Sequence, residues 1–159
     1  SDADAAEVAV PVTVQAAIGA RIDRLDDRAK QTLNAASVIG AQFGVDSFEA
    51  LGVDPVFDSL LTAELIDQVQ FTPTAGYAFH HPLIRAVAYE SQLRSDRADL
   101  HGRVAAAIES CDPAAADENA ALIADHWESA GDLHAAQPVL IGAPALYIEY
   151  LPSAQQCHA

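Results

Sequence analysis

The residues best suited to chemistry gather in one short stretch, where His80 and His81 precede Pro82 and Arg85 follows one helical turn later. A histidine ring changes its charge near neutral pH, and an arginine forms paired hydrogen bonds with phosphate or carboxylate groups. If a helix begins at Pro82, the histidines stand at its N-terminus, where backbone N–H groups attract anions. If the protein has a functional centre, we expect it in this stretch, where the helix N-terminus at His81 attracts anions and Arg85 could support a phosphate or a carboxylate.

Simpler interpretations of these histidines stay open. His81 would then only cap the helix and satisfy backbone groups of its first turn. His80 is expected to be a solvent-facing residue of a strand. A zinc site made by the pair is disfavoured, because neighbouring residues point apart and no third ligand has suitable spacing.

The sequence carries no recognisable catalytic machinery. Ser37 and Ser91 lie outside any nucleophile-elbow pattern, and no Gly-x-x-x-x-Gly-Lys-Ser/Thr phosphate loop is present. The only lysine, Lys30, falls inside a predicted helix, and no aspartates are arranged as a cyclase metal site. Cys111 and Cys157 lack metal-ligand spacing and are expected to be reduced thiols. We expect a chain that is not an enzyme and binds no cofactor or metal alone.

Composition narrows the class of partner. The 159 residues include 8 basic and 23 acidic side chains, a net charge of −15, and all basic residues lie between Arg21 and Arg103. Because phosphate binding needs cations, nucleic acid is an unlikely partner. There is no apolar run long enough to span a membrane, and the acidic first residues do not resemble a signal peptide. We expect a cytoplasmic protein.

The first half of the chain is predicted to be mostly helical. Residues 1–11 have the composition of a linker, and apolar residues at helical spacing predict helices over about 13–25 and 27–39, the second stopped by Gly40. Arg21 and Arg24 fall on the outer side of the first helix. They either contact a neighbouring domain or pair in solvent with Asp23 and Asp27.

A short sheet is predicted to follow. We expect residues 43–44 to be a connector, a short helix near 45–51, and a fourth helix that starts at Asp54-Pro55. Apolar residues then alternate with polar ones over 66–72 and 77–79, on either side of the turn 73–76, which predicts a two-stranded hairpin. With the helix after Pro82, residues 12–92 predict a winged-helix-like domain.

The remaining residues predict a helical extension over 93–136. Helices are expected over about 96–110 and 117–130, with His101 as a partly buried packing residue and His126 and Trp127 in the core. Residues 137–159 form an irregular apolar tail interrupted by prolines. The fold class is mainly α, with one β-hairpin.

The chain resembles the region that follows the nucleotide-binding core of bacterial STAND-type signal-transduction ATPases, as in cyclase-associated and LuxR-type regulators. The resemblance covers about four-fifths of the chain and rests on Thr13–Ile18, Arg21–Leu25, Ala35–Gly40 with Phe43, Phe79–Arg85 with Val87–Tyr89, Arg97, Leu100-His101, and Ala130–Asp132 with Ala136. The last segment is similar to the first turn of a tetratricopeptide-type array.

The resemblance implies a function. In such proteins the winged-helix domain packs over the nucleotide site of the neighbouring ATPase domain, and a histidine at the hairpin-to-helix junction senses the nucleotide. Here His81 best matches that position, with Arg85 beside it. The expected partner is an ATPase domain, and ATP or ADP would bind only together with it. Because the expected repeat array stops after one helical hairpin, we also expect self-association through the apolar tail.

Two other functions remain as alternatives. A winged helix can bind DNA, but residues 56–64, where the recognition helix would lie, contain Asp58 and Glu64 and no Lys or Arg. A free-standing protein-interaction scaffold would use the helical extension and the apolar tail.

Overall fold

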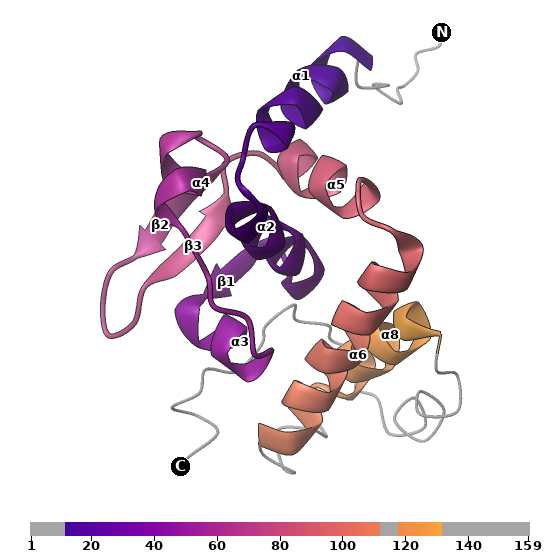
Figure 1. Ribbon diagram of the computed structural model, residues 1–159. Helices are drawn as coiled ribbons and strands as arrows, with labels where there is room; N and C mark the ends of the chain where they lie inside the picture. The colour runs from indigo at the N-terminus through magenta and orange to yellow at the C-terminus, as the bar shows by residue number, and fades with distance from the viewer. Residues whose placement is uncertain (1–11, 112–117, 132–159) are drawn as a thin grey trace, which may run out of the picture.

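The computed structural model describes residues 12–111 and 118–131, and it is mainly helical with one small antiparallel sheet (Figure 1). The predicted linker 1–11, residues 132–136 of the predicted extension and the whole tail 137–159, with Cys157, lie outside the described residues. Along the chain the elements are α1 (Val12–Asp23), α2 (Asp27–Ile39), β1 (Gln42–Gly44), α3 (Val45–Ala50), α4 (Asp58–Thr62), β2 (Ile66–Gln70), β3 (Gly76–Phe79), α5 (Pro82–Glu90), α6 (Arg94–Cys111) and α8 (Ala120–Ala130).

Helix α2 lies at the centre of the molecule, between the sheet with α4 on one side and α5 and α6 on the other (Figure 1). Asp26 caps it by accepting a hydrogen bond from the backbone N–H of Ala29 at 2.8 Å, and the chain leaves it at Gly40, as the sequence predicts. Most of its residues are fully buried, and several are alanine or serine. These small side chains let helices on two sides approach closely.

The sheet has three strands in the order β1–β3–β2. The predicted hairpin is present as β2 and β3, with Ile66 opposite Phe79 and Gln68 opposite Tyr77. The expectation of a connector at residues 43–44 is wrong, because Phe43 pairs with Tyr77 and makes β1 a third strand. Because β3 lies far along the chain, the three residues of β1 carry no local sequence pattern that predicts a strand.

The fourth helix begins later than the sequence predicts. Residues 54–57 are not helical, and α4 starts at Asp58. The backbone N–H of Val56 donates instead to the Oγ1 atom of the fully buried Thr32 at 2.9 Å, and Arg28 on α2 pairs with Asp54. These contacts hold residues 54–57 against α2 in a non-helical conformation. The helix therefore does not begin at Pro55.

One continuous hydrophobic core joins the predicted winged-helix-like region to the extension. Phe48, Leu33 and Leu60 belong to the same cluster as Ile108 and Ile123. Phe43 stacks on Tyr77, which also stacks on Phe57 with ring centroids 4.2 Å apart. Helices α6 and α8 therefore pack on the same core as α2. No described helix is long and apolar enough to cross a membrane.

Replacing Thr32 with valine tests the contact that sets the start of α4. The change keeps the side-chain shape but leaves the Val56 N–H without its acceptor. We expect the free energy of unfolding to fall by about 1–3 kcal/mol, measured by urea denaturation. The exposed Thr62→Val is the matched control. Equal urea midpoints for Thr32→Val and the wild type would show that this hydrogen bond contributes nothing.

Candidate functional site

His81 lies at the junction between β3 and α5, and it is the N-cap of α5. The His81 ring accepts a hydrogen bond at Nδ1 from the backbone N–H of Leu83 at 3.1 Å, and its carbonyl accepts one from Ile84 at 2.9 Å. Pro82 supplies no N–H. The sequence predicted that backbone N–H groups at this helix end would attract an anion. One of these groups, the N–H of Leu83, is instead bonded to the His81 ring. With Nδ1 accepting, a neutral ring carries its proton on Nε2, which is the donor it offers to other groups.

His80 is exposed, as predicted, but it lies just after β3 rather than within the strand. Its Nδ1 atom lies 2.8 Å from Oδ2 of Asp67 on β2, and both side chains are more than half exposed. Neighbouring histidines therefore have different partners, His81 on the helix backbone and His80 on the hairpin. Within residues 12–111 and 118–131, no three His, Cys, Asp or Glu side chains are grouped to hold a metal ion.

Arg85 supports α2. Its Nε atom donates to the carbonyl oxygen of Ser37 at 2.9 Å. Ser37 lies in the last turn of α2, where carbonyl groups have no partner within the helix and a cation is favourable. Arg85 also borders a hollow of about 400 Å³ that contains Phe79, Pro82 and Tyr89 in its wall. The cation one turn from His81 thus fastens α5 to α2.

The structure brings Arg21 and Arg24 together at another place, on an open groove of about 630 Å³ between α1 and α4. Arg21 donates to the carbonyl of Ala63, just after α4. Arg24 is exposed, and among the described residues neither arginine forms an ion pair with Asp23 or Asp27. The pairing expected of a solvated helix face is therefore not seen in this part of the chain.

Sequence reasoning missed a buried polar cluster that α5, α6 and α8 form together. His101 on α6 and His126 on α8 are 6% and 4% exposed, and their Nδ1 atoms are 2.7 Å apart. The Nε2 atom of His101 lies 2.8 Å from the hydroxyl oxygen of Tyr89 on α5. His101 was expected to be only partly buried and to serve in packing. It is instead the middle of a polar chain that joins three helices.

Burial is the main cause of the electrostatics of this pair. It lowers the pKa of His101 to about 4 and that of His126 to about 4, so both rings are neutral at pH 7. Asp125 acts in the opposite direction and raises both pKa values, whereas the Arg85 charge lowers them. A buried neutral pair is stable only when each polar nitrogen finds a partner.

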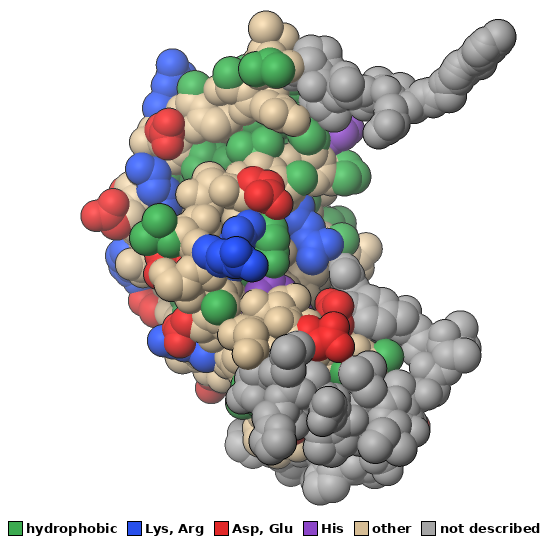
Figure 2. Space-filling model, turned by 90° about the vertical axis from the view of Figure 1, so that its right-hand side faces the viewer, with side chains coloured by type: hydrophobic (Ala, Val, Ile, Leu, Met, Phe, Trp, Pro, Cys, Tyr) green, Lys and Arg blue, Asp and Glu red, His purple; other side chains and the backbone are tan. Residues whose placement is uncertain are grey.

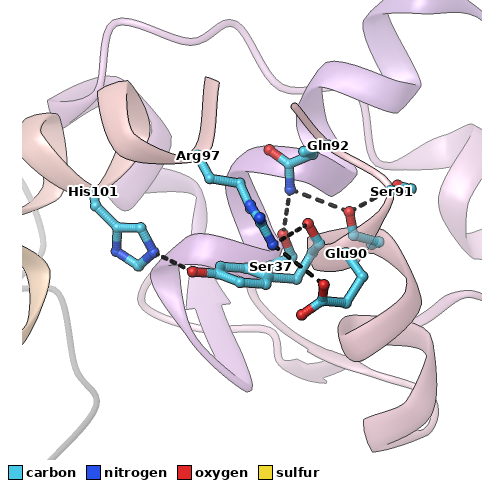
Figure 3. A network of polar contacts seen from close by, with 8 residues as sticks. Ser37, Glu90, Ser91, Gln92, Arg97 and His101 are labelled. Carbon is cyan, nitrogen blue, oxygen red and sulfur yellow. Dashed lines mark hydrogen bonds and ion pairs between the residues drawn. The ribbon is translucent and has the colours of Figure 1, made fainter. Parts of the chain in front are cut away.

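A network of polar contacts that includes Ser37, Gln92 and Arg97 holds the turn between α5 and α6 (Figure 3). Arg97 lies over the Tyr89 ring, 4.7 Å from its centroid, and forms an ion pair with Glu90 at 3.5 Å. In the turn, the Gln92 side chain donates to Ser37 Oγ at 2.9 Å and to the carbonyl of Asn34 at 3.3 Å. Figure 2 shows the side of the molecule that lies to the right in Figure 1, with positively charged side chains near its middle.

A sequence signal for the histidine pair did exist. His101 stands three residues before Val104 and seven before Ile108, which places it on the buried stripe of its helix, and His126 follows Ile123 by three. Helical spacing therefore marks both as inward positions. Their meeting across two helices, 25 residues apart, is not a sequence pattern.

Comparison with known proteins identifies one similar sequence. An uncharacterized protein of Rhizobium meliloti (strain 1021) is 29% identical over 122 residues, which cover 72% of this chain and 12% of that protein. The chain thus spans about an eighth of the length of the relative it matches. No protein-family model matches the sequence, and no solved structure matches the fold.

Tyr89→Phe tests whether the hydroxyl at the end of the polar chain stabilises the fold. The change removes the partner of His101 Nε2 and keeps the ring under Arg97. We expect a loss of about 0.5–1.5 kcal/mol in the free energy of unfolding, measured by urea denaturation. Tyr77→Phe is the control, because the Tyr77 hydroxyl has no hydrogen bond among the described residues. Equal losses in both variants would contradict a specific role for Tyr89.

Proposed function

We propose that this chain is a non-catalytic regulatory module that relays the nucleotide state of an ATPase domain through domain contacts. The observation that carries the proposal is the order α2–β1–α3–α4–β2–β3 with strands arranged β1–β3–β2. A winged helix has the same order of elements, and in the proposed assignment α3 and α4 correspond to its helix-turn-helix pair and β2–β3 to its wing. It supports the winged-helix-like domain to which the sequence resemblance points, followed by α6 and α8 as the start of a tetratricopeptide-like array.

The surface of the winged-helix-like region favours a protein partner over DNA. Helix α4, in the place of a recognition helix, has Asp58 in its first turn and no cation. The β2–β3 wing contains no Lys or Arg and exposes Val69 and Phe71, which are 53% and 70% exposed. Phosphate binding needs cations, and exposed apolar groups are buried by contact with another protein surface.

The relation to a much longer protein also supports a module that acts beside other domains. Because the matched region is 12% of the Rhizobium meliloti relative, a domain partner can lie within one polypeptide. ATP or ADP would then be bound by the ATPase domain, with this chain placed against it. The groove that Arg21 and Arg24 share is an exposed place for a domain contact.

In the proposed function, His81 is the residue that contacts the nucleotide. Its cap fixes the ring at the end of α5, and a neutral ring in this arrangement has its donor on Nε2. A donor held in one orientation can recognise a phosphate oxygen of a nucleotide bound by the neighbouring domain. Arg85 then connects the same helix to α2, so that a displacement of α5 reaches the core.

Loss of the His81 ring should weaken nucleotide retention. We would titrate ADP by calorimetry into an isolated ATPase domain of a bacterial cyclase-associated regulator, with and without this chain. The expected result is tighter ADP binding with the chain present and no gain with His81→Ala. His80→Ala, which removes the adjacent exposed ring, should keep the gain. Binding of ADP to the chain alone, or the same gain with His81→Ala, would reject the proposed role.

Charge reversal at Arg24 tests the domain-interface part of the proposal. Arg24 is exposed on the groove, so Arg24→Glu should not disturb the fold but should repel an anionic partner surface. We expect the affinity for the ATPase domain to fall about tenfold, with a weaker salt dependence. Arg94→Glu makes the same charge change at an exposed position away from this groove and is the control. Equal affinity of the Arg24 and Arg94 variants would place the interface elsewhere.

A further inference from the structure

The buried chain Tyr89–His101–His126 fastens α8 to the corner between α5 and α6. Each of its three residues comes from a different helix, and each hydrogen bond crosses a helix boundary. Beyond these bonds, α8 is held mainly by its packing on α6. The polar chain is therefore a connection between α8 and its neighbours that depends on the protonation state of two imidazoles.

The hydrogen-bonded chain Tyr89–His101–His126 can take up one proton with every group still paired, but not two. In the neutral pair, one Nδ1 donates to the other across 2.7 Å, and His101 Nε2 either accepts from or donates to the Tyr89 hydroxyl. One added proton still leaves every group paired, because a charged His101 donates from Nδ1 to His126 and from Nε2 to Tyr89. A second proton places two N–H groups and two positive charges face to face at 2.7 Å.

The surroundings decide when protons are taken up. Arg85 on α5 and Arg97 on α6 both oppose a positive charge on His101, and Asp125 on α8 favours one. His126 is opposed by His101 and Arg85 and favoured by Asp125. Burial and the charges of the two arginines all oppose protonation of His101. The closed arrangement therefore stays neutral until the medium is acidic.

We propose that the Tyr89–His101–His126 chain is a proton-operated latch that holds α8 closed when neutral and releases it when both imidazoles are protonated. The inference is independent of the proposed function. The direction follows from linkage: in water both rings take up protons near pH 6.5, whereas closed burial lowers each pKa to about 4. The stability of the closed state is therefore fully present above about pH 6.5 and is lost as the pH falls toward about 4.

Release should be local to α8. The other histidines among the described residues, His80 and His81, are exposed, so the α2 and sheet region holds no buried imidazole to protonate. The contact between α8 and α6 has its own reporter. Trp127 is the only tryptophan, lies on α8 and donates from Nε1 to Glu109 on α6 at 2.9 Å. Its emission therefore responds to separation of the two helices.

The experiment follows Trp127 fluorescence and far-UV circular dichroism of the full chain from about pH 7.5 to about pH 4. The expected result is a red shift of the emission that begins below about pH 6.5 and precedes the main loss of helical signal. In His126→Gln, which replaces one imidazole by a neutral amide, the midpoint should move at least about one pH unit lower or disappear. His80→Gln should behave like the wild type.

Three results would overturn the latch. They are an unchanged midpoint in His126→Gln, a fluorescence change that coincides with loss of the helical signal, and emission that stays constant until the whole fold is lost. If His126→Gln does not fold, the wild-type histidines can be titrated directly by the NMR signals of their imidazole carbons. Titration of either buried ring near pH 6.5 in the folded chain would also reject the proposal.

Discussion

The fold depends on the burial of one face of α2 and on the need to satisfy the carbonyl groups of its last turn without water. A buried helix leaves the carbonyls of its last turns without partners inside the helix. Here a partner comes from far along the chain, because Arg85 donates to the carbonyl of Ser37, and Gln92 donates to the Oγ atom of the same residue. An orphaned buried carbonyl costs about 1–3 kcal/mol, so these contacts constrain where α5 and the following turn can lie.

Local rules in the sequence predicted the helices and the hairpin, because caps, prolines and periodic apolar residues act within a few positions. Gly40 and Pro82 lie where the sequence predicts them, beside the end of α2 and at the start of α5. The errors arise where distant residues decide. Strand β1 exists because Phe43 pairs with Tyr77, and the late start of α4 follows from the bond between Val56 and Thr32.

The same distinction explains the candidate site. The cap at His81 is a local arrangement and could be predicted, including its simpler interpretation as a capping residue. The partner of Arg85 could not, because Ser37 lies 48 residues earlier. His101 and His126 were each placed toward the core by their helical spacing, but only the packing of α6 on α8 brings their nitrogens within a hydrogen bond. Helix α5 relates these groups, since His81 caps it, Arg85 anchors it to α2, and Tyr89 near its end meets His101.

The central position of β3 in the sheet also has a consequence for the order of folding. Only residues 71–75 separate β2 from β3, so these two strands can pair by closing a short loop. Strand β1 is made much earlier during synthesis, yet it has no partner until β3 has been added, with residues 45–75 between them. On a ribosome, α2 and β1 therefore leave the exit tunnel without the surface that will cover them. The rate at which the chain becomes native is set by this non-local pairing rather than by its fast-forming helices.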